Sequence, residues 1–246
     1  MQRPRGPGGN WWARGRRWAR GHWRPGGQRW SRERRGSWEA AIALAVGYAC
    51  GAVPVAGRVG RAAGVDVYRE GEANPGATNA WRLAGPGAGL AVLAGDVAKG
   101  ALPVLVARRV FPADRAAGAG RPAGRTIGPT PARWATWAAG VGAILGHGFP
   151  PGGRRGGRSV ATLAGVLAAL APVPAAAAAA VTLAILPLRG REAAITAGLV
   201  AYPIAHGTLR RDLPELAAVG ALEAGVALRW AATRQRDPVR TADPAS

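Results

Sequence analysis

Long stretches without a charged residue constrain this chain more than any of its other features. Residues 159–188 contain no Asp, Glu, Lys or Arg over 30 positions, and residues 40–57 contain none over 18 positions. A straight helix of 30 residues is about 45 Å long, whereas the hydrocarbon core of a bilayer is ~30 Å thick. We therefore expect one membrane span at 40–57 and two short helices within 159–188, separated at Pro172 and Pro174.

Four further apolar stretches follow the same pattern, with most of the arginines in the gaps between them. They are residues 83–107, 134–149, 193–209 and 213–228. Short stretches of this kind also occur as buried helices of water-soluble proteins, which is the alternative interpretation. Six of them in 246 residues are more typical of a membrane protein. We predict an all-α membrane protein, a bundle of about seven short transmembrane helices.

The first 37 residues differ sharply from the rest. They hold eleven Arg and one Glu, which is half of the chain's net charge of +20, together with interleaved Trp, Gly and Pro. This composition predicts a disordered basic arm at 1–37, a membrane domain at 38–232 and a short tail at 233–246. Such an arm is either dispensable or able to bind RNA or anionic lipid, through phosphate contacts and aromatic stacking.

Cysteine and histidine are too scarce for most metal sites. The chain has one cysteine, Cys50, and three histidines. An internal disulfide and a multi-cysteine zinc or iron–sulfur site are therefore excluded, as is a His-rich metal site. We expect no metal site.

Two polar gaps carry residues suited to binding phosphate. In the first gap, residues 64–82, the run NPGATN combines turn-forming residues with hydrogen-bonding side chains before an apolar span, and Arg82 can form a bidentate clamp. In the second gap, residues 146–162, a Gly-Gly pair lies between Arg155 and Arg158, a pattern that favours an anion-binding nest. A simple capping turn is the alternative for the first gap.

Ionisable residues inside the apolar stretches are candidates for chemistry. Asp96 and Lys99 are three residues apart, so they lie on one helix face and can form an ion pair. His147 stands where an apolar stretch meets the second polar gap, and histidine is the side chain best suited to proton transfer near neutral pH. The alternatives are a structural ion pair and a hydrogen-bonded interfacial histidine.

These residues together resemble a known enzyme family. NPGATN with Arg82, followed by Asp96, Lys99 and Gly100, resembles the first conserved block of the bacterial acyl-phosphate glycerol-3-phosphate acyltransferases, the PlsY family. GHGFP followed by RRGGRSVAT resembles its second block, and the resemblance runs from about residue 44 to 206.

The resemblance implies a seven-helix bundle in the cytoplasmic membrane. It also implies transfer of a fatty acyl group from acyl phosphate to the 1-hydroxyl of glycerol 3-phosphate, giving lysophosphatidate for phospholipid synthesis without a cofactor. The phosphate-binding residues would be Asn74, Gly76, Thr78, Asn79, Arg82, Arg155, Gly156, Gly157 and Arg158. His147 and Lys99 are the candidate catalytic residues. Both substrates and membrane lipid are the expected partners, and nucleic acid is the least favoured one.

Several positions depart from the family pattern. Glu72 stands where the family has serine, and a carboxylate there repels a phosphate unless it is protonated or paired with an arginine. Trp230 and Thr233 stand where the family has histidine and asparagine. If that histidine carries catalysis, His147 or a phosphate of the substrate must take the proton. The alternatives are a degenerate paralogue that binds phospholipid or regulates an active copy, and a membrane-anchored nucleic-acid binder.

Overall fold

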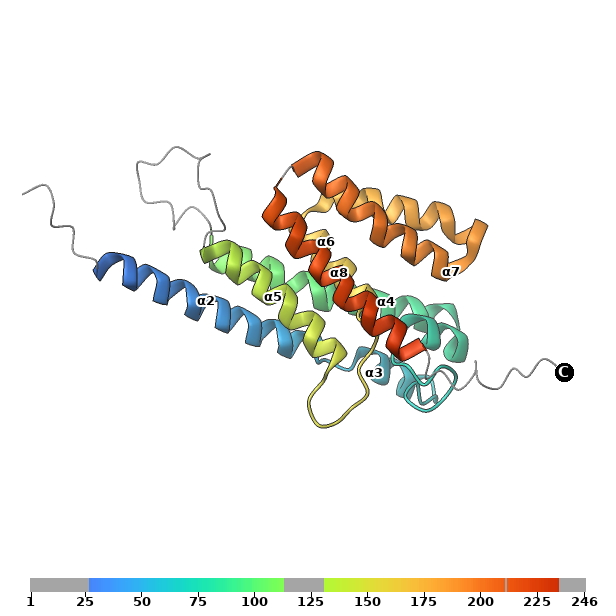
Figure 1. Cartoon of the computed structure of the whole chain (residues 1–246). Helices are drawn as coiled ribbons and strands as arrows, with labels where there is room; N and C mark the ends of the chain where they lie inside the picture. The colour runs from blue at the N-terminus through green and yellow to red at the C-terminus, as the bar shows by residue number, and fades with distance from the viewer. Residues whose placement is uncertain (1–26, 113–130, 211, 235–246) are drawn as a thin grey trace, which may run out of the picture. The chain divides into compact units, whose positions relative to one another are not determined.

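The computed structural model describes residues 27–112, 131–210 and 212–234. They form seven helices, which are, in chain order, α2 (Gly27–Gly51), α3 (Val55–Ala62), α4 (Ala77–Val110), α5 (Pro131–Gly148), α6 (Val160–Leu170), α7 (Pro172–Arg210) and α8 (Leu213–Arg234) (Figure 1). The chain divides into two compact units, Met1–Arg35 and Gly36–Ser246, and the following description concerns the second. Most of the predicted arm and tail falls on residues 1–26 and 235–246, which lie outside the described residues, whereas residues 27–37 of the arm, predicted to be disordered, belong to helix α2.

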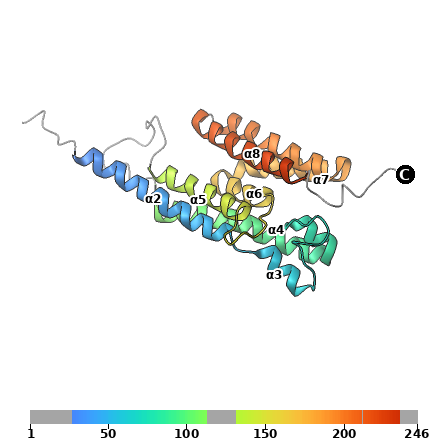
Figure 2. The same cartoon turned by 60° about the horizontal axis from the view of Figure 1, so that its bottom comes forward.

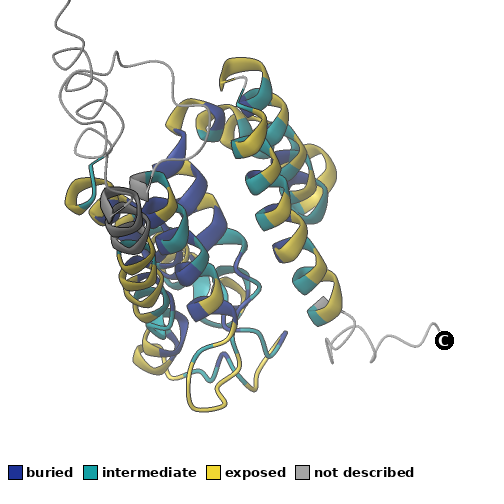
Figure 3. Cartoon of the chain, turned by 60° about the vertical axis from the view of Figure 1, so that its left-hand side comes forward, coloured by how far each residue is buried: buried dark blue, intermediate teal, exposed yellow. Residues whose placement is uncertain are grey.

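Helices α4 and α6 make most of the contacts between the helices of this unit. Helix α4 contacts α3, α5 and α6, while α6 also contacts α5, α7 and α8, and α7 contacts α8 (Figures 1 and 2). Buried positions concentrate on α4, α5 and α6, whereas α7 and α8 are mostly exposed or half-buried (Figure 3). Their exposed side chains include large apolar ones such as Leu183, Leu188 and Leu213. An apolar exterior of this kind suits a lipid environment.

Four segments among the described residues are long and apolar enough to cross a membrane. They are Ser37–Ala62, Ala77–Val110, Pro172–Arg210 and Leu213–Thr233. Helix α6, with 11 residues, is shorter than a full crossing. The bundle of short apolar helices predicted from the sequence is therefore present.

Proline and glycine decide where the long apolar stretches break. Helix α6 ends at Leu170 and α7 begins at Pro172, so the 30-residue stretch divides at the prolines as expected. The two helices expected at the end of 159–188 and at 193–209 are both present; they share the label α7 and meet at Gly190, where the backbone is not helical. Gly190 has φ of 77°, a left-handed conformation that favours glycine. The bend brings Arg191, the next residue, to one end of the bundle.

Glycines allow α2 and α5 to approach closely. Gly47 and Gly51 lie one turn apart on α2, and Gly142 and Gly146 lie one turn apart on α5. A Cβ atom at Gly47 would overlap the backbone carbonyl of Ala139, and the other three glycines meet the facing backbone in the same way. Small residues spaced by four are the usual means of tight helix packing in membranes, where lipid removes the hydrophobic drive.

We predict that Gly47→Ala lowers the melting temperature of the detergent-solubilised protein, because the added methyl group meets a backbone carbonyl that cannot move aside. A cost of about 1–3 kcal/mol is typical of overpacking. The matched control is Gly220→Ala on α8, where a Cβ atom meets nothing within 4 Å. That variant should be as stable as the wild type, or more stable, because alanine favours helix. Equal melting temperatures for both variants would contradict the packing account.

Candidate functional site

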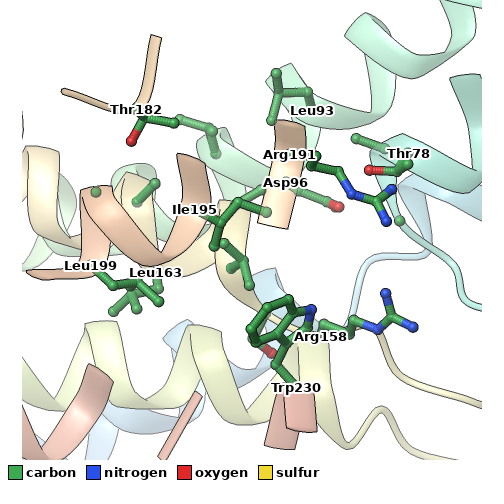
Figure 4. A pocket seen from close by; sticks show the side chains of 18 of the residues that line it. Thr78, Leu93, Asp96, Arg158, Leu163, Thr182, Arg191, Ile195, Leu199 and Trp230 are labelled. Carbon is green, nitrogen blue, oxygen red and sulfur yellow. The ribbon is translucent and has the colours of Figure 1, made fainter. Parts of the chain in front are cut away.

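A cavity of about 470 Å³ lies among α4, α6 and α7, close to the end of α8. One of its ends is polar and is lined by Arg158, Arg191 and the start of α4. The other is lined by leucines and alanines of α6 and α7, including Leu163 and Leu199 (Figure 4). The cavity can therefore receive a molecule with an anionic head and an apolar chain.

The start of α4 contributes backbone donors to the polar end. Gly76 is the N-cap residue of α4, and no side chain caps this end of the helix. Gly76, Ala77 and Thr78 line the cavity, as does Asn74. The first N–H groups of a helix have no partner within the helix and carry partial positive charge, so this end attracts an anion.

Three arginines from three different parts of the chain converge on the carboxylate of Glu72. Arg158 Nη1 lies 3.0 Å from Oε2, Arg191 Nη1 lies 3.4 Å from Oε1, and Arg82 Nη1 also contacts Oε1. The Glu72 side chain is 4% exposed. The repulsion of phosphate expected from this carboxylate is thus offset by pairing with arginine, the second of the two conditions considered from the sequence. The group as a whole keeps a net charge of +2.

Asn79 holds the loop that carries Glu72. Its side chain accepts a hydrogen bond from the backbone N–H of Glu72 (2.9 Å) and donates to the carbonyl oxygens of Val67 (3.1 Å) and Glu70 (3.0 Å). Asn79 is fully buried and does not line the cavity. The sequence placed Asn79 among the phosphate ligands; in the structure its amide shapes the loop.

Lys99 connects the polar ends of three elements. Its ammonium donates to the carbonyl oxygen of Val53 after α2 (2.9 Å) and to His147 Nδ1 on α5 (3.0 Å). It also pairs with Asp96 Oδ1 one turn earlier on α4 (2.8 Å). The ammonium thus makes two hydrogen bonds, to Val53 and His147, and a close ion pair with Asp96. Lys99 does not line the cavity, whereas Asp96 and His147 do.

The contact with Lys99 determines which nitrogen of His147 carries the proton. Since Lys99 can only donate, Nδ1 must accept, and the ring N–H is on Nε2. His147 in this state offers a hydrogen-bond donor. Among the described residues, no group of three or more His, Cys, Asp and Glu side chains could hold a metal ion.

The glycines of the second polar gap pack tightly on the end of α5. A Cβ atom at Gly156 would overlap the carbonyl oxygen of Gly148, and one at Gly157 would overlap His147 Nε2. These two glycines line a separate cavity of about 20 Å³, which has room for about one water molecule. Arg155 lines it too and donates to the carbonyl oxygen of Ala73 (3.4 Å).

Arg229 of α8 also binds the backbone of this segment. Its Nε donates to the carbonyl oxygen of Gly157 (3.0 Å), its Nη2 donates to that of Gly148, and the guanidinium lies 4.2 Å from the ring centroid of Phe149. The next residue, Trp230, lines the cavity at the place where the family resemblance led us to expect a histidine.

The predicted site residues therefore fall into two groups. Those that line the main cavity are Asn74, Gly76, Thr78, His147 and Arg158. Those beside it are Asn79, Arg82, Lys99, Arg155, Gly156 and Gly157. Sequence reasoning missed Arg191 and the lining position of Trp230. The signal for Arg191 was weak: it follows Arg189-Gly190, a short basic gap between two apolar stretches.

We predict that Lys99→Met lowers the free energy of unfolding by about 3–5 kcal/mol, because it leaves the buried Asp96 carboxylate without its partner. The double variant Asp96→Asn with Lys99→Met should recover much of the lost stability, measured as the melting temperature in detergent. It should stay below the wild type, since the contacts with Val53 and His147 are also gone. A Lys99→Met protein as stable as the wild type would show that this cluster does not hold the helices together.

Comparison with known proteins gives relatives of one kind. The family model described as glycerol-3-phosphate acyltransferase matches residues 41–236. A glycerol-3-phosphate acyltransferase of Methylorubrum extorquens is 38% identical over 74% of this chain and 84% of its own length. Glycerol-3-phosphate acyltransferase 1 of Deinococcus radiodurans is 41% identical over 54% of this chain and 59% of its own length.

Solved structures give the same result. The crystal structure of PlsY (YgiH), an integral membrane glycerol 3-phosphate acyltransferase, in its glycerol 3-phosphate form, matches with a TM-score of 0.66 and 25% identity. The match covers 80% of this chain and 90% of that one, and the lysophosphatidic acid form matches with a TM-score of 0.65. The predicted all-α, multi-pass membrane architecture and the predicted class of enzyme, an acyltransferase, are confirmed. The chain belongs to the glycerol-3-phosphate acyltransferase family.

Proposed function

We propose that this protein transfers a fatty acyl group from acyl phosphate to the 1-hydroxyl of glycerol 3-phosphate in the cytoplasmic membrane, giving lysophosphatidate. The observation that carries the proposal is the two-ended cavity, with arginines and an uncapped helix start at one end and apolar walls at the other. Its relatives are named for the same acceptor. Acyl phosphate as the donor rests on the resemblance and on the phosphate-binding character of this end.

In this proposal the polar end binds phosphate and the apolar end binds the acyl chain. Arg158 and Arg191 supply charge-assisted hydrogen bonds, and the N–H groups at the start of α4 add to them. Leu163, Leu199 and their neighbours exclude water from the chain of the donor. Holding both reactants in one site converts a reaction between two molecules into an effectively intramolecular one.

The chemical step needs little from the side chains, because acyl phosphate is already activated. The hydroxyl oxygen of the acceptor forms a bond with the acyl carbon, and the bond between that carbon and the phosphate oxygen breaks. The hydroxyl proton passes to the departing phosphate. His147, with its proton on Nε2, acts as a hydrogen-bond donor rather than as the base, and Lys99 holds it in that state. The two candidate catalytic residues thus work as a pair that positions the substrates.

Turnover by the full-length protein tests the proposal. Membranes containing it would be given acyl phosphate and labelled glycerol 3-phosphate, and labelled lysophosphatidate would be counted. We expect product with acyl phosphate and none with an acyl thioester as donor. Arg158→Ala should lower kcat/KM by roughly 10- to 150-fold, the effect of about 1.5–3 kcal/mol for a hydrogen bond to a charged group.

The matched control is Arg69→Ala, because the Arg69 side chain is 88% exposed and, among the described residues, forms an ion pair only with Asp66. It should retain wild-type turnover. A folded protein that makes no product with either donor would refute the proposal. If it still bound glycerol 3-phosphate, it would correspond to the alternative, a family member without turnover.

A further inference from the structure

The position of Glu72 has a consequence beyond the stability of its own loop. Its two carboxylate oxygens receive contacts from all three arginines of the cluster, Arg82, Arg158 and Arg191. Two of these, Arg158 and Arg191, line the polar end of the cavity, as does Glu72 itself. The groups best placed to bind a substrate phosphate are therefore already bound to an anion of the protein.

The loop holds this carboxylate firmly in the cluster. The backbone N–H of Glu72 donates to the fully buried Asn79, and Ala73, the next residue, adopts a left-handed conformation with φ of 48°. A non-glycine residue rarely takes this conformation, so the backbone turn after Glu72 is maintained by its surroundings. Glu72 is thus a built-in part of the site rather than a mobile surface side chain.

A carboxylate and a phosphate compete for the same guanidinium donors. Both present oxygen acceptors with negative charge, and both accept arginine in similar bidentate geometry. We propose that Glu72 is an internal competitor of the substrate phosphate: it occupies the arginine cluster in the empty site, and Arg158 and Arg191 must turn from it toward the phosphate when substrate binds. This inference rests on the proposed function, since it assigns the phosphate of that substrate to this end of the cavity.

The competition lowers affinity in two ways. The arginine contacts to Glu72 must be given up for contacts to phosphate, so part of the free energy gained from binding phosphate is offset. The negative charge of Glu72 also remains within a few ångströms of the bound dianion and repels it. A neutral residue at this position removes both effects and raises the net charge of the cluster from +2 to +3. Glu72 is therefore the residue that sets the affinity of this site for phosphate monoesters.

Charge removal at Glu72 tests the inference. The variant Glu72→Gln keeps the size of the side chain, and its matched control is Glu70→Gln, the same change two residues away. Among the described residues, the Glu70 side chain forms no ion pair with any of the three arginines. Its Oε1 accepts a hydrogen bond from the backbone N–H of Asp66 (2.6 Å), and a glutamine side chain can keep this bond. Full-length proteins would be compared for the Kd of glycerol 3-phosphate and for its KM in turnover.

We expect Glu72→Gln to bind glycerol 3-phosphate roughly tenfold more tightly than the wild type, the size expected when one nearby, partly screened like charge is removed. Glu70→Gln should bind like the wild type. Unchanged or weaker binding by a folded Glu72→Gln protein would overturn the inference, because Glu72 would then organise the arginines for substrate instead of competing with it.

Two further measurements keep the test decisive. Should Glu72→Gln not fold, Glu72→Ser carries the same expectation with a smaller neutral side chain. In the wild type, a structure with glycerol 3-phosphate bound should show Arg158 and Arg191 on the phosphate and beyond 4 Å from Glu72; retention of both Glu72 contacts would overturn the inference. A wild type that binds no glycerol 3-phosphate and forms no product would instead refute the proposed function.

Discussion

The ammonium of Lys99 is the contact on which the polar half of this molecule depends. It joins the end of α2 through the carbonyl oxygen of Val53, α4 through Asp96 and α5 through His147. A buried charge is tolerated only when it is paired and hydrogen-bonded, and Lys99 meets this condition through its ion pair with Asp96 and its hydrogen bonds to Val53 and His147. The same contact sets the tautomer of His147. One buried cation therefore fixes both the helix ends and the chemical state of a residue that faces the cavity.

A second cluster, formed by Glu72 and its three arginines, serves a different purpose. The Lys99 cluster is closed, because its donors are used within the protein. The arginine cluster is open to the cavity and keeps a net charge of +2, so it can still attract an anion. The two clusters separate the tasks of holding the helices together and binding substrate. Glu72 holds the arginines in the empty site and competes with a phosphate for them.

The sequence predicted the elements of the fold better than the contacts of the site. Charge-free stretches and the prolines at 172 and 174 indicated where helices run and where they break, because both signals act locally. The run NPGATN correctly marked a helix start at the cavity, but its side chains could not be oriented from spacing alone. Asn79 turns into the loop, whereas Thr78, one residue earlier, faces the cavity. That difference of one position depends on packing against residues 66–72.

By itself, the sequence determined an all-helical membrane protein with its arginines in the gaps, since apolar length and the cost of burying charge leave few alternatives. It also indicated that Glu72 must be either protonated or paired with an arginine, because an isolated carboxylate beside a phosphate site is unfavourable. Only the tertiary structure showed that Glu72 is paired, and with which arginines. Arg82, Arg158 and Arg191 are separated by 76 and 33 positions along the chain, and they meet because the start of α4, the residues just before α6 and the bend at Gly190 lie together. Contacts between residues so far apart in the sequence arise from helix packing, which no local pattern of residues specifies.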